Sequence, residues 1–317
     1  MAHLAGFGRS LPEAVVTNAS LATELSVAEE WILQVSGIRE RRRAADGETA
    51  ATLAHAASLQ ALASAGLSPT DLGAIVVGTG SAPRRFPGVS SELQNLLGAG
   101  GIPAFDVPLA SSGGLVALAL ATDLAPRYGP VLAVGTEVMS RILDRPPRVR
   151  ETAILFGDGA GAAVVLPGPG PIEITDIRFA GDGALGADLS LGEGEPLAMN
   201  GRTVILQASR KIPSAIRDIL QRAGLSPADV DLFVLHQANL VLLRQVAKSL
   251  GVDEARLFVN VDRYGNTSAA SLLVALAEAV EEGRVASSSR VVLGAFGAGF
   301  SWGAALLTVR PVPSVPA

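Results

Sequence analysis

The strongest constraint on the fold of this chain is a repeat inside it. The segment Ala65–Leu72 (AGLSPTDL) returns 158 positions later as Ala223–Val230 (AGLSPADV). At the same offset, Leu115–Ala119 (LVALA) returns as Leu273–Ala277. Two matches in one register, at half the length of a 317-residue chain, argue against chance. We therefore expect two halves of one topology, related by a pseudo-two-fold axis.

Each half is expected to follow the same order of helices and strands. Continuous apolar strands that alternate with helices are typical of strands buried on both faces, and so of a layered α/β architecture. A Pro- and Gly-rich stretch at 167–171 separates the halves, which predicts an N-terminal half 1–167 and a C-terminal half 168–317. The predicted helices are 49–65 and 208–223, and the predicted strands are 74–77 and 232–235.

The segment Phe105–Ala119 is the most informative part of the first half. An apolar strand ends at Pro108, a short turn carries Ser111 and Ser112, and an apolar helix follows. Free backbone N–H groups and the helix dipole favour a developing anion at such a turn. We therefore predict that Ser111 is a catalytic nucleophile. The alternative is that either serine only caps a buried helix.

In the second half, His236 and Asn266 occupy comparable positions. His236 follows the apolar strand 232–235, and Asn266 precedes the helix that repeats the one behind Ser111. Ligands of α/β sheets gather beyond the C-terminal ends of strands. If both helix tips point at one pocket, Ser, His and Asn converge there in a set capable of acyl transfer. A buried core histidine and an asparagine in a turn are the alternatives.

Composition excludes several classes of function. The chain has no cysteine, which excludes disulfides, thiolate metal sites and a cysteine nucleophile. A net charge of -5 argues against nucleic acid as a partner, and no run of apolar residues reaches the ~18 needed to span a bilayer. No signal peptide is visible, so we expect a cytoplasmic protein with no membrane partner. The low charged fraction, 17%, favours a surface covered by a second copy.

Several collinear motifs resemble β-ketoacyl-acyl-carrier-protein synthase III of the thiolase superfamily, over essentially the whole chain. The resemblance implies a thiolase-like fold of five αβαβα layers and a homodimer. It also implies a coenzyme A thioester as substrate, no permanently bound cofactor or metal, and an acyl carrier protein as a partner. The matching pieces are 30–32, 36–41, 104–107, 141–144, 156–163, 236–240, 265–271 and 296–303.

The resemblance also assigns roles to individual positions. His236 and Asn266 match the catalytic His and Asn of the family, and the N–H groups of Ser111 and Ala298 match its oxyanion hole. Trp31 and Arg150 match the pair that sandwiches the adenine of coenzyme A, since an indole and a guanidinium both stack on a base. Arg202 stands where an asparagine usually touches coenzyme A. Phe86 matches a residue that reaches the partner's acyl pocket, and Phe296 is expected in the substrate pocket.

One departure from the family concerns the nucleophile itself, because Ser111 stands where the family has its catalytic cysteine. A hydroxyl does not ionise as a thiol does, so Ser111 is expected to need His236 as a general base. Three explanations remain open. A natural serine variant still condenses a starter acyl group with malonyl-carrier protein. The enzyme instead transfers the acyl group to an alcohol, amine or carrier. Or the serine is an engineered replacement that traps an intermediate.

Two further points bear on partners. Val241 stands where the family commonly has an arginine that docks the acidic carrier protein, which predicts weaker docking. A non-catalytic partner subunit is the alternative from another class of function. The presence of both His236 and Asn266 argues against it, because such a subunit needs neither.

Overall fold

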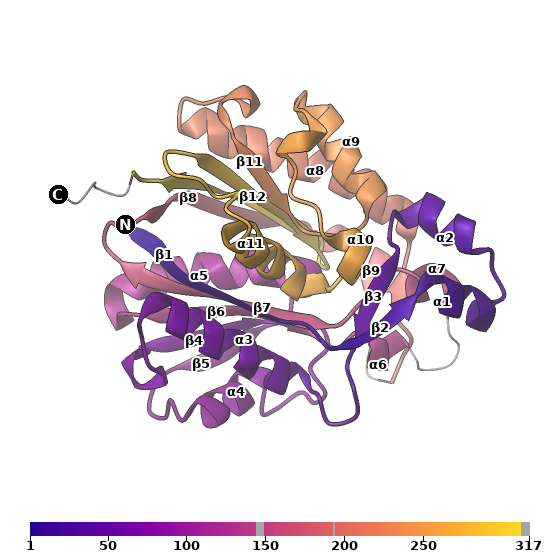
Figure 1. Ribbon diagram of the computed structural model, residues 1–317, viewed down its shortest axis with the longest axis horizontal. Helices are drawn as coiled ribbons and strands as arrows, with labels where there is room; N and C mark the ends of the chain where they lie inside the picture. The colour runs from indigo at the N-terminus through magenta and orange to yellow at the C-terminus, as the bar shows by residue number, and fades with distance from the viewer. Residues whose placement is uncertain (144–148, 193, 312–317) are drawn as a thin grey trace.

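The computed structural model describes residues 1–143, 149–192 and 194–311. Its helices and strands lie in five layers, seen from bottom to top in Figure 1. The outer helices α3 (Ala50–Ala65) and α4 (Val89–Leu97) cover the first sheet, and α8 (Gly201–Arg222) and α9 (Leu240–Leu250) cover the second. Between the sheets lie α5 (Gly113–Tyr128) and α11 (Ser271–Glu281).

The nine main strands have the order β11-β12-β13-β8-β1-β7-β6-β4-β5. The strands of the first half meet those of the second where His3 and Leu4 pair with Glu173 and Ile172. The first half uses β1 (Ala2–Ser10), β4 (Ala74–Gly78), β5 (Ala104–Val107), β6 (Val131–Glu137) and β7 (Gly159–Pro167). The second uses β8 (Ile172–Gly181), β11 (Leu232–Leu235), β12 (Arg290–Gly297) and β13 (Ser301–Val309).

The smaller elements lie at one end of the sheets. They are β2 (Ala14–Thr17), α1 (Asn18–Leu25), α2 (Glu29–Ser36), β3 (Glu40–Arg43), α6 (Ser140–Leu143), α7 (Arg150–Ala153), β9 (Leu189–Ser190), β10 (Ala198–Met199) and α10 (Val261–Tyr264). Figure 1 shows α1, α2 and α7 together beside the sheets.

The sequence repeat is visible in the structure. The strands β4 and β11 and the helices α5 and α11 begin 158 residues apart, and a 3-10 turn precedes each helix, at Ala110–Ser112 and Ser268–Ala270. Each turn begins with a residue in the left-handed region, φ 45° at both Ala110 and Ser268. In this register Ser111 is the counterpart of Ala269. Asn266, which the sequence placed near the position of Ser111, lies three residues before that counterpart.

Local chemistry explains the observed helix boundaries. Thr49 and Thr52 form a reciprocal capping box that starts α3, and Gly66 ends it in the left-handed conformation. The predicted helix 208–223 in fact begins at Gly201, because the side chain of Asn200 caps it by accepting from the N–H of Thr203. Asparagine is favoured both in turns and at helix N-caps, so the sequence pattern alone does not locate the first residue of α8.

The central strands of the first sheet and the two helices of the middle layer are largely buried. All residues of β4 and β6 and most of α5 and α11 are buried, as expected for strands covered on both faces. The N-terminal ends of α5 and α11 approach closely because the residues where they meet have small side chains or none. A Cβ on Gly114 would lie 2.4 Å from the carbonyl oxygen of Ala269. This close approach brings the two repeated turns side by side.

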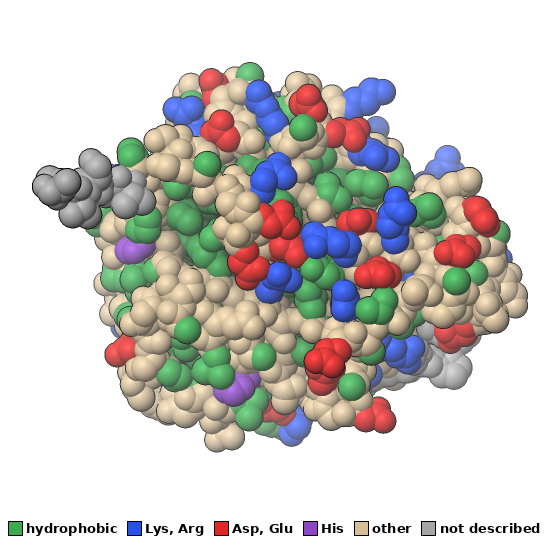
Figure 2. All heavy atoms as spheres, viewed as in Figure 1, with side chains coloured by type: hydrophobic (Ala, Val, Ile, Leu, Met, Phe, Trp, Pro, Cys, Tyr) green, Lys and Arg blue, Asp and Glu red, His purple; other side chains and the backbone are tan. Residues whose placement is uncertain are grey.

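Acidic and basic side chains are interspersed over the face in Figure 2. None of the described helices has the length and apolar character needed to cross a bilayer.

Candidate active site

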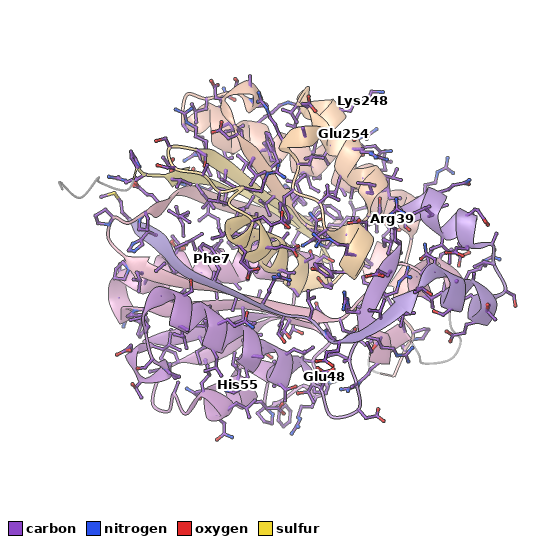
Figure 3. The ribbon with its side chains drawn as sticks, in the orientation of Figure 1. Phe7, Arg39, Glu48, His55, Lys248 and Glu254 are labelled. Atoms are coloured by element: carbon purple, nitrogen blue, oxygen red, sulfur yellow. The ribbon has the colours of Figure 1, made fainter. Side chains whose placement is uncertain are left out.

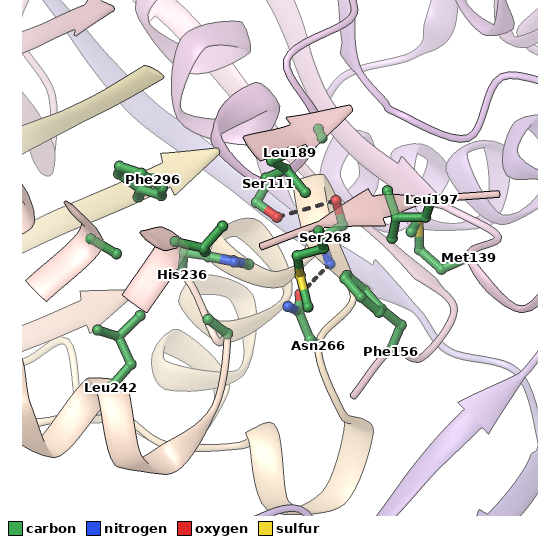
Figure 4. Close-up of a pocket in the computed structure, with 15 residues that line it drawn as sticks. Ser111, Met139, Phe156, Leu189, Leu197, His236, Leu242, Asn266, Ser268 and Phe296 are labelled. Atoms are coloured by element: carbon green, nitrogen blue, oxygen red, sulfur yellow. Dashed lines mark hydrogen bonds between the residues drawn. The ribbon is translucent and has the colours of Figure 1, made fainter. Parts of the chain in front are cut away.

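A cavity of about 70 Å³ lies between the two halves, at the C-terminal ends of the strands. Four residues that the sequence singled out line it: Ser111, His236, Asn266 and Phe296. Figure 4 shows that they come from both halves of the chain. The rest of the lining is mainly apolar: Ala110, Met139, Phe156, Leu189, Leu197, Met199, Val204, Ala208, Ala238 and Leu242, with Ser268 as a further polar group.

The two serines of the turn before α5 point their hydroxyls in different directions. The hydroxyl of Ser112 is 2.6 Å from Ser301 Oγ and also donates to the carbonyl of Leu109, away from the cavity. Ser112 is also the N-cap of α5, and its side chain makes no capping hydrogen bond. Ser111 lines the cavity instead. Neither serine side chain caps α5, so the alternative that one of them only caps this helix does not explain their positions.

The hydroxyl of Ser111 contacts Ser268 rather than His236. Ser111 Oγ donates to Ser268 Oγ at 3.4 Å (Figure 4). Within the described residues, no hydrogen bond joins Ser111 to His236. The side-chain oxygen of Asn266 accepts from the N–H of Ser268 at 2.9 Å, so its NH₂ group remains to donate to a ligand.

His236 is held by a second serine, Ser271. Its Nδ1 lies 2.5 Å from Ser271 Oγ, and the same oxygen accepts from the N–H of Gln237 at 3.1 Å. Since Ser271 Oγ already accepts one hydrogen bond, we assign its own hydrogen to Nδ1, which places the ring hydrogen on Nε2. Burial lowers the pKa of His236 to about 3. At neutral pH the ring is therefore an uncharged N–H donor.

This environment predicts how stability depends on pH. The pKa of His236 is about 3 in the folded protein, below its ordinary 6.5, so the unfolded state binds one more proton between those values. Stability that is present above pH 6.5 is lost as the pH falls, by up to about 1.4 kcal/mol per pH unit. We expect His236→Gln to reduce this slope in urea unfolding at pH 4–6.5. An unchanged slope would contradict the assignment.

The segments that carry the two expected oxyanion donors, Ser111 and Ala298, pack against each other. Ala298 directly follows β12, whose last residue Gly297 packs on the turn at Ser112: an added Cβ there would lie 2.4 Å from the Ser112 nitrogen. Ala298 itself does not line the cavity. Its carbonyl accepts from Ser301 Oγ at 2.6 Å, which fixes this turn.

The residues expected at coenzyme A and at the partner lie outside the cavity. Trp31 is half-buried on α2 and packs on the cluster that contains Ile154, just after α7. Arg150 begins α7, its side chain is 61% exposed, and it pairs with Glu151 at 2.9 Å.

The other positions that the resemblance assigned to coenzyme A or to the partner are also at the surface. Arg202 is exposed in the first turn of α8. Phe86 is 83% exposed. Asp144, at the end of one motif, lies outside the described residues.

The other two histidines, His3 and His55, do not line the cavity. His3 lies on β1, with Nδ1 3.1 Å from the carbonyl oxygen of Gly168. His55 lies on α3 in the outer layer (Figure 3). Within the described residues, no group of three or more His, Cys, Asp or Glu side chains could hold a metal ion.

Sequence reasoning missed Glu137 and Ser268. Glu137 is completely buried at the C-terminal end of β6, where ligands of such sheets gather, and that position was the available signal. Ser268 matches Ala110 at the repeat offset. The segment from Asp182 to Gly201, which shapes the substrate tunnel in the family that the chain resembles, supplies Leu189, Leu197 and Met199 to the cavity.

Comparisons with known proteins agree with this architecture. Residues 105–184 match the family model "3-Oxoacyl-[acyl-carrier-protein (ACP)] synthase III", and residues 220–309 match its C-terminal model. The chain is 42% identical to β-ketoacyl-[acyl-carrier-protein] synthase III of Chelativorans sp. (strain BNC1), covering 95% of this chain and 97% of that protein. It is 41% identical to the corresponding protein of Xanthomonas campestris pv. campestris, covering 96% and 97%.

Solved structures give the same result. The 3-oxoacyl-[acyl-carrier-protein] synthase III of Aquifex aeolicus VF5 matches with a TM-score of 0.93 and 36% identity, over 97% of this chain and all of that one. The priming β-ketosynthase of the R1128 polyketide pathway matches with a TM-score of 0.91 and 33% identity, over 99% and 97%. The thiolase-like fold expected from the sequence is thereby confirmed.

Proposed function

Because this chain belongs to the 3-oxoacyl-[acyl-carrier-protein] synthase III family, we propose that it is an acyltransferase that starts fatty-acid or polyketide synthesis. Ser111 takes an acyl group from an acyl-coenzyme A or acyl-carrier thioester. The group then passes to malonyl-carrier protein in a decarboxylative condensation. The observation that carries this proposal is the meeting of Ser111, His236 and Asn266 in one cavity with an apolar lining suited to a hydrocarbon chain.

The first step forms an acyl-serine. Ser111 Oγ attacks the thioester carbon, the C–S bond breaks, and the thiol of coenzyme A leaves. The backbone N–H groups of Ser111 and Ala298 hold the oxyanion, where losing one such donor costs ~3–4 kcal/mol. Ser111 also lies just before the N-terminus of α5, whose dipole favours that negative charge.

The second step forms the carbon–carbon bond. His236 Nε2–H and the Asn266 NH₂ donate to the thioester carbonyl of the malonyl group. Loss of carbon dioxide leaves an enolate whose oxygen these two donors stabilise. Its carbon attacks the acyl-serine carbonyl, the ester bond breaks, and the Ser111 alkoxide takes up one proton from solvent. An uncharged His236 suits this role, since it donates without needing to titrate.

Binding roles follow the resemblance. We propose that Trp31 and Arg150 hold the adenine of coenzyme A, with Arg202 nearby. The exposed Phe86 reaches the acyl pocket of a second copy in a homodimer. For the carrier protein, Lys248 lies on the same helix as Val241, α9, while Arg244 is engaged with Glu254 at 3.0 Å. This arrangement supports weak docking of an acidic carrier.

A second candidate function rests on Ser111 itself. We infer that Ser111 replaces the cysteine of the family, and an acyl-serine is an ordinary ester, less ready than a thioester to receive a carbanion. Transfer of the acyl group to an alcohol, an amine or a carrier thiol needs only an acceptor in place of the malonyl group.

One experiment tests the proposal. The protein is incubated with acyl-coenzyme A, and its intact mass is measured. We expect one acyl adduct, which fragmentation of the peptide Phe86–Arg127 places on Ser111. Release of carbon dioxide on adding malonyl-carrier protein supports condensation. An adduct without carbon dioxide supports the non-condensing transfer, and no adduct overturns both.

A further inference from the structure

The proposed function leaves one chemical question open, which is what removes the proton from Ser111. A hydroxyl is a far weaker acid than a thiol and is activated by an adjacent base. His236 is not bonded to Ser111, and its Nε2 carries a hydrogen in the assignment above. The hydroxyl that Ser111 does contact belongs to Ser268, at 3.4 Å. Ser268 also lies beside the carboxylate of Glu137, whose Oε1 accepts from the N–H of the next residue, Ala269, at 3.2 Å.

We propose that Ser268 and Glu137 form a proton relay that activates Ser111. Ser268 is a catalytic residue, because it touches the reacting oxygen, and Glu137 is a positioning residue that acts through it. The relay joins the two halves of the chain, since Ser111 and Glu137 lie in the first and Ser268 in the second. This inference rests on the proposed function.

The surroundings of Glu137 fit a carboxylate. Its oxygens accept from the N–H of Gly80 at 2.9 Å and from the N–H of Ala269 at 3.2 Å. They also accept from the hydroxyls of Ser81 at 2.5 Å and Thr79 at 3.3 Å. Each of these four groups is a donor. Four donors to the carboxylate stabilise its negative charge at rest.

The hydroxyls around Glu137 share one pattern. Ser81 Oγ accepts from the N–H of Val138 at 2.9 Å, and Thr79 Oγ1 accepts from the N–H of Ser81 at 3.2 Å. Each hydroxyl oxygen therefore accepts one hydrogen bond and directs its own hydrogen to the carboxylate. Ser268 Oγ likewise accepts one hydrogen bond, but its donor is the hydroxyl of Ser111. That difference connects the carboxylate to the nucleophile.

Burial makes this carboxylate a better base. Glu137 is completely buried, and desolvation raises the pKa of its carboxyl above the ordinary value despite the hydrogen bonds that lower it. A base works best when its pKa approaches the working pH. A surface glutamate would be too weak a base to assist an alcohol.

The backbone holds Ser268 in place. Its φ of 45° lies in the left-handed region, which is strained for a residue other than glycine. Its N–H is fixed by Asn266 at 2.9 Å. The 3.4 Å contact to Ser111 is longer than the usual ~2.7–2.8 Å for two hydroxyls, as is common for catalytic hydrogen bonds that tighten when substrate binds.

The proton is conserved through the step. As Ser111 Oγ bonds to the acyl carbon, its hydrogen passes to Ser268 Oγ, and the hydrogen of Ser268 passes to Glu137. When the C–S bond breaks, Glu137 returns a proton to Ser268 Oγ, and Ser268 passes its hydrogen to the departing thiolate. The products are acyl-serine and the free thiol, and Glu137 is again a carboxylate.

The test is the rate of acylation of the full-length protein by acyl-coenzyme A, measured in a single turnover by intact mass. We expect Ser268→Ala and Glu137→Gln each to lower the rate about 10²-fold or more. In the parent, the rate should fall at acid pH as Glu137 protonates, and Glu137→Gln should lose this limb of the profile. Ser81→Ala is the matched control: it removes a hydrogen bond to the same carboxylate without touching Ser111. We expect it to stay near the parent rate.

A second set of variants, made in Ser111→Cys, distinguishes loss of the proton relay from a general disturbance of the structure. In Ser111→Cys, the helix N-terminus can lower the thiol pKa, so the nucleophile no longer needs the relay. Adding Ser268→Ala there should change the rate little. Equal losses in both backgrounds, or a parent rate in Ser268→Ala, would overturn the relay. No adduct on the parent protein would overturn the proposed function itself.

Discussion

Ser111→Ala should form no acyl adduct and should lose at least about 10⁴-fold in acyl transfer from acyl-coenzyme A, because the atom that bonds to the acyl group is gone. The loss is expected without a comparable loss of stability. Ser111 makes one long hydrogen bond, to Ser268, and its methylene stays in alanine. The measurement is coenzyme A release, followed with a thiol reagent that the cysteine-free protein cannot consume.

The neighbouring serine provides the control. Ser112→Ala removes a hydroxyl from the same turn, and with it the 2.6 Å contact to Ser301. That hydroxyl points away from the cavity, so we expect a loss of about 1 kcal/mol in stability and retained adduct formation. If Ser111→Ala were acylated as fast as the parent, the nucleophile would have to lie elsewhere.

Gly297→Ala should damage both stability and activity although it adds only one methyl group. The new Cβ would lie 2.4 Å from the nitrogen of Ser112 and 2.7 Å from the carbonyl oxygen of Leu109. Both atoms belong to the backbone turn that carries Ser111, so the turn itself must move. We expect a loss of about 1–3 kcal/mol in the free energy of unfolding. A shift of ~1 Å in Ser111 would cost about 10²-fold in acylation.

Urea unfolding and single-turnover acylation measure the two effects. Gly100→Ala is the matched control, since nothing lies within 4 Å of its added Cβ and its backbone is not in the left-handed region. We expect that variant to behave like the parent. A normal acylation rate in Gly297→Ala would mean that the turn tolerates movement, which would weaken the oxyanion hole proposed for Ser111 and Ala298.

The repeat was the most reliable guide to the fold. Local patterns located α3, β4 and β11 to within a residue, because capping residues, glycines and apolar runs act over short distances. They placed the start of α8 seven residues late, since Asn200 becomes a cap only when the following segment is helical. The boundary between halves at 167 and 168 remains a prediction.

The sequence also predicted three of the polar residues that line the cavity. Ser111, His236 and Asn266 were selected as residues at strand ends and helix starts, and such positions follow from the order of elements along the chain. The resemblance motifs added Phe296, which lines the same cavity. The roles of these residues, and those of Trp31, Arg150 and Arg202, remain predictions that binding and kinetic measurements must test.

What the sequence determined by itself was therefore the two-fold plan, the layered class and the set of polar groups at the ends of strands, because these depend on composition and local order. Tertiary structure decided which groups touch. It directed Ser111 toward Ser268, turned Ser112 toward Ser301 and enclosed Glu137 in hydrogen-bond donors. These contacts join residues more than fifty positions apart, and their geometry depends on how closely the glycine- and alanine-rich tips of α5 and α11 can pack.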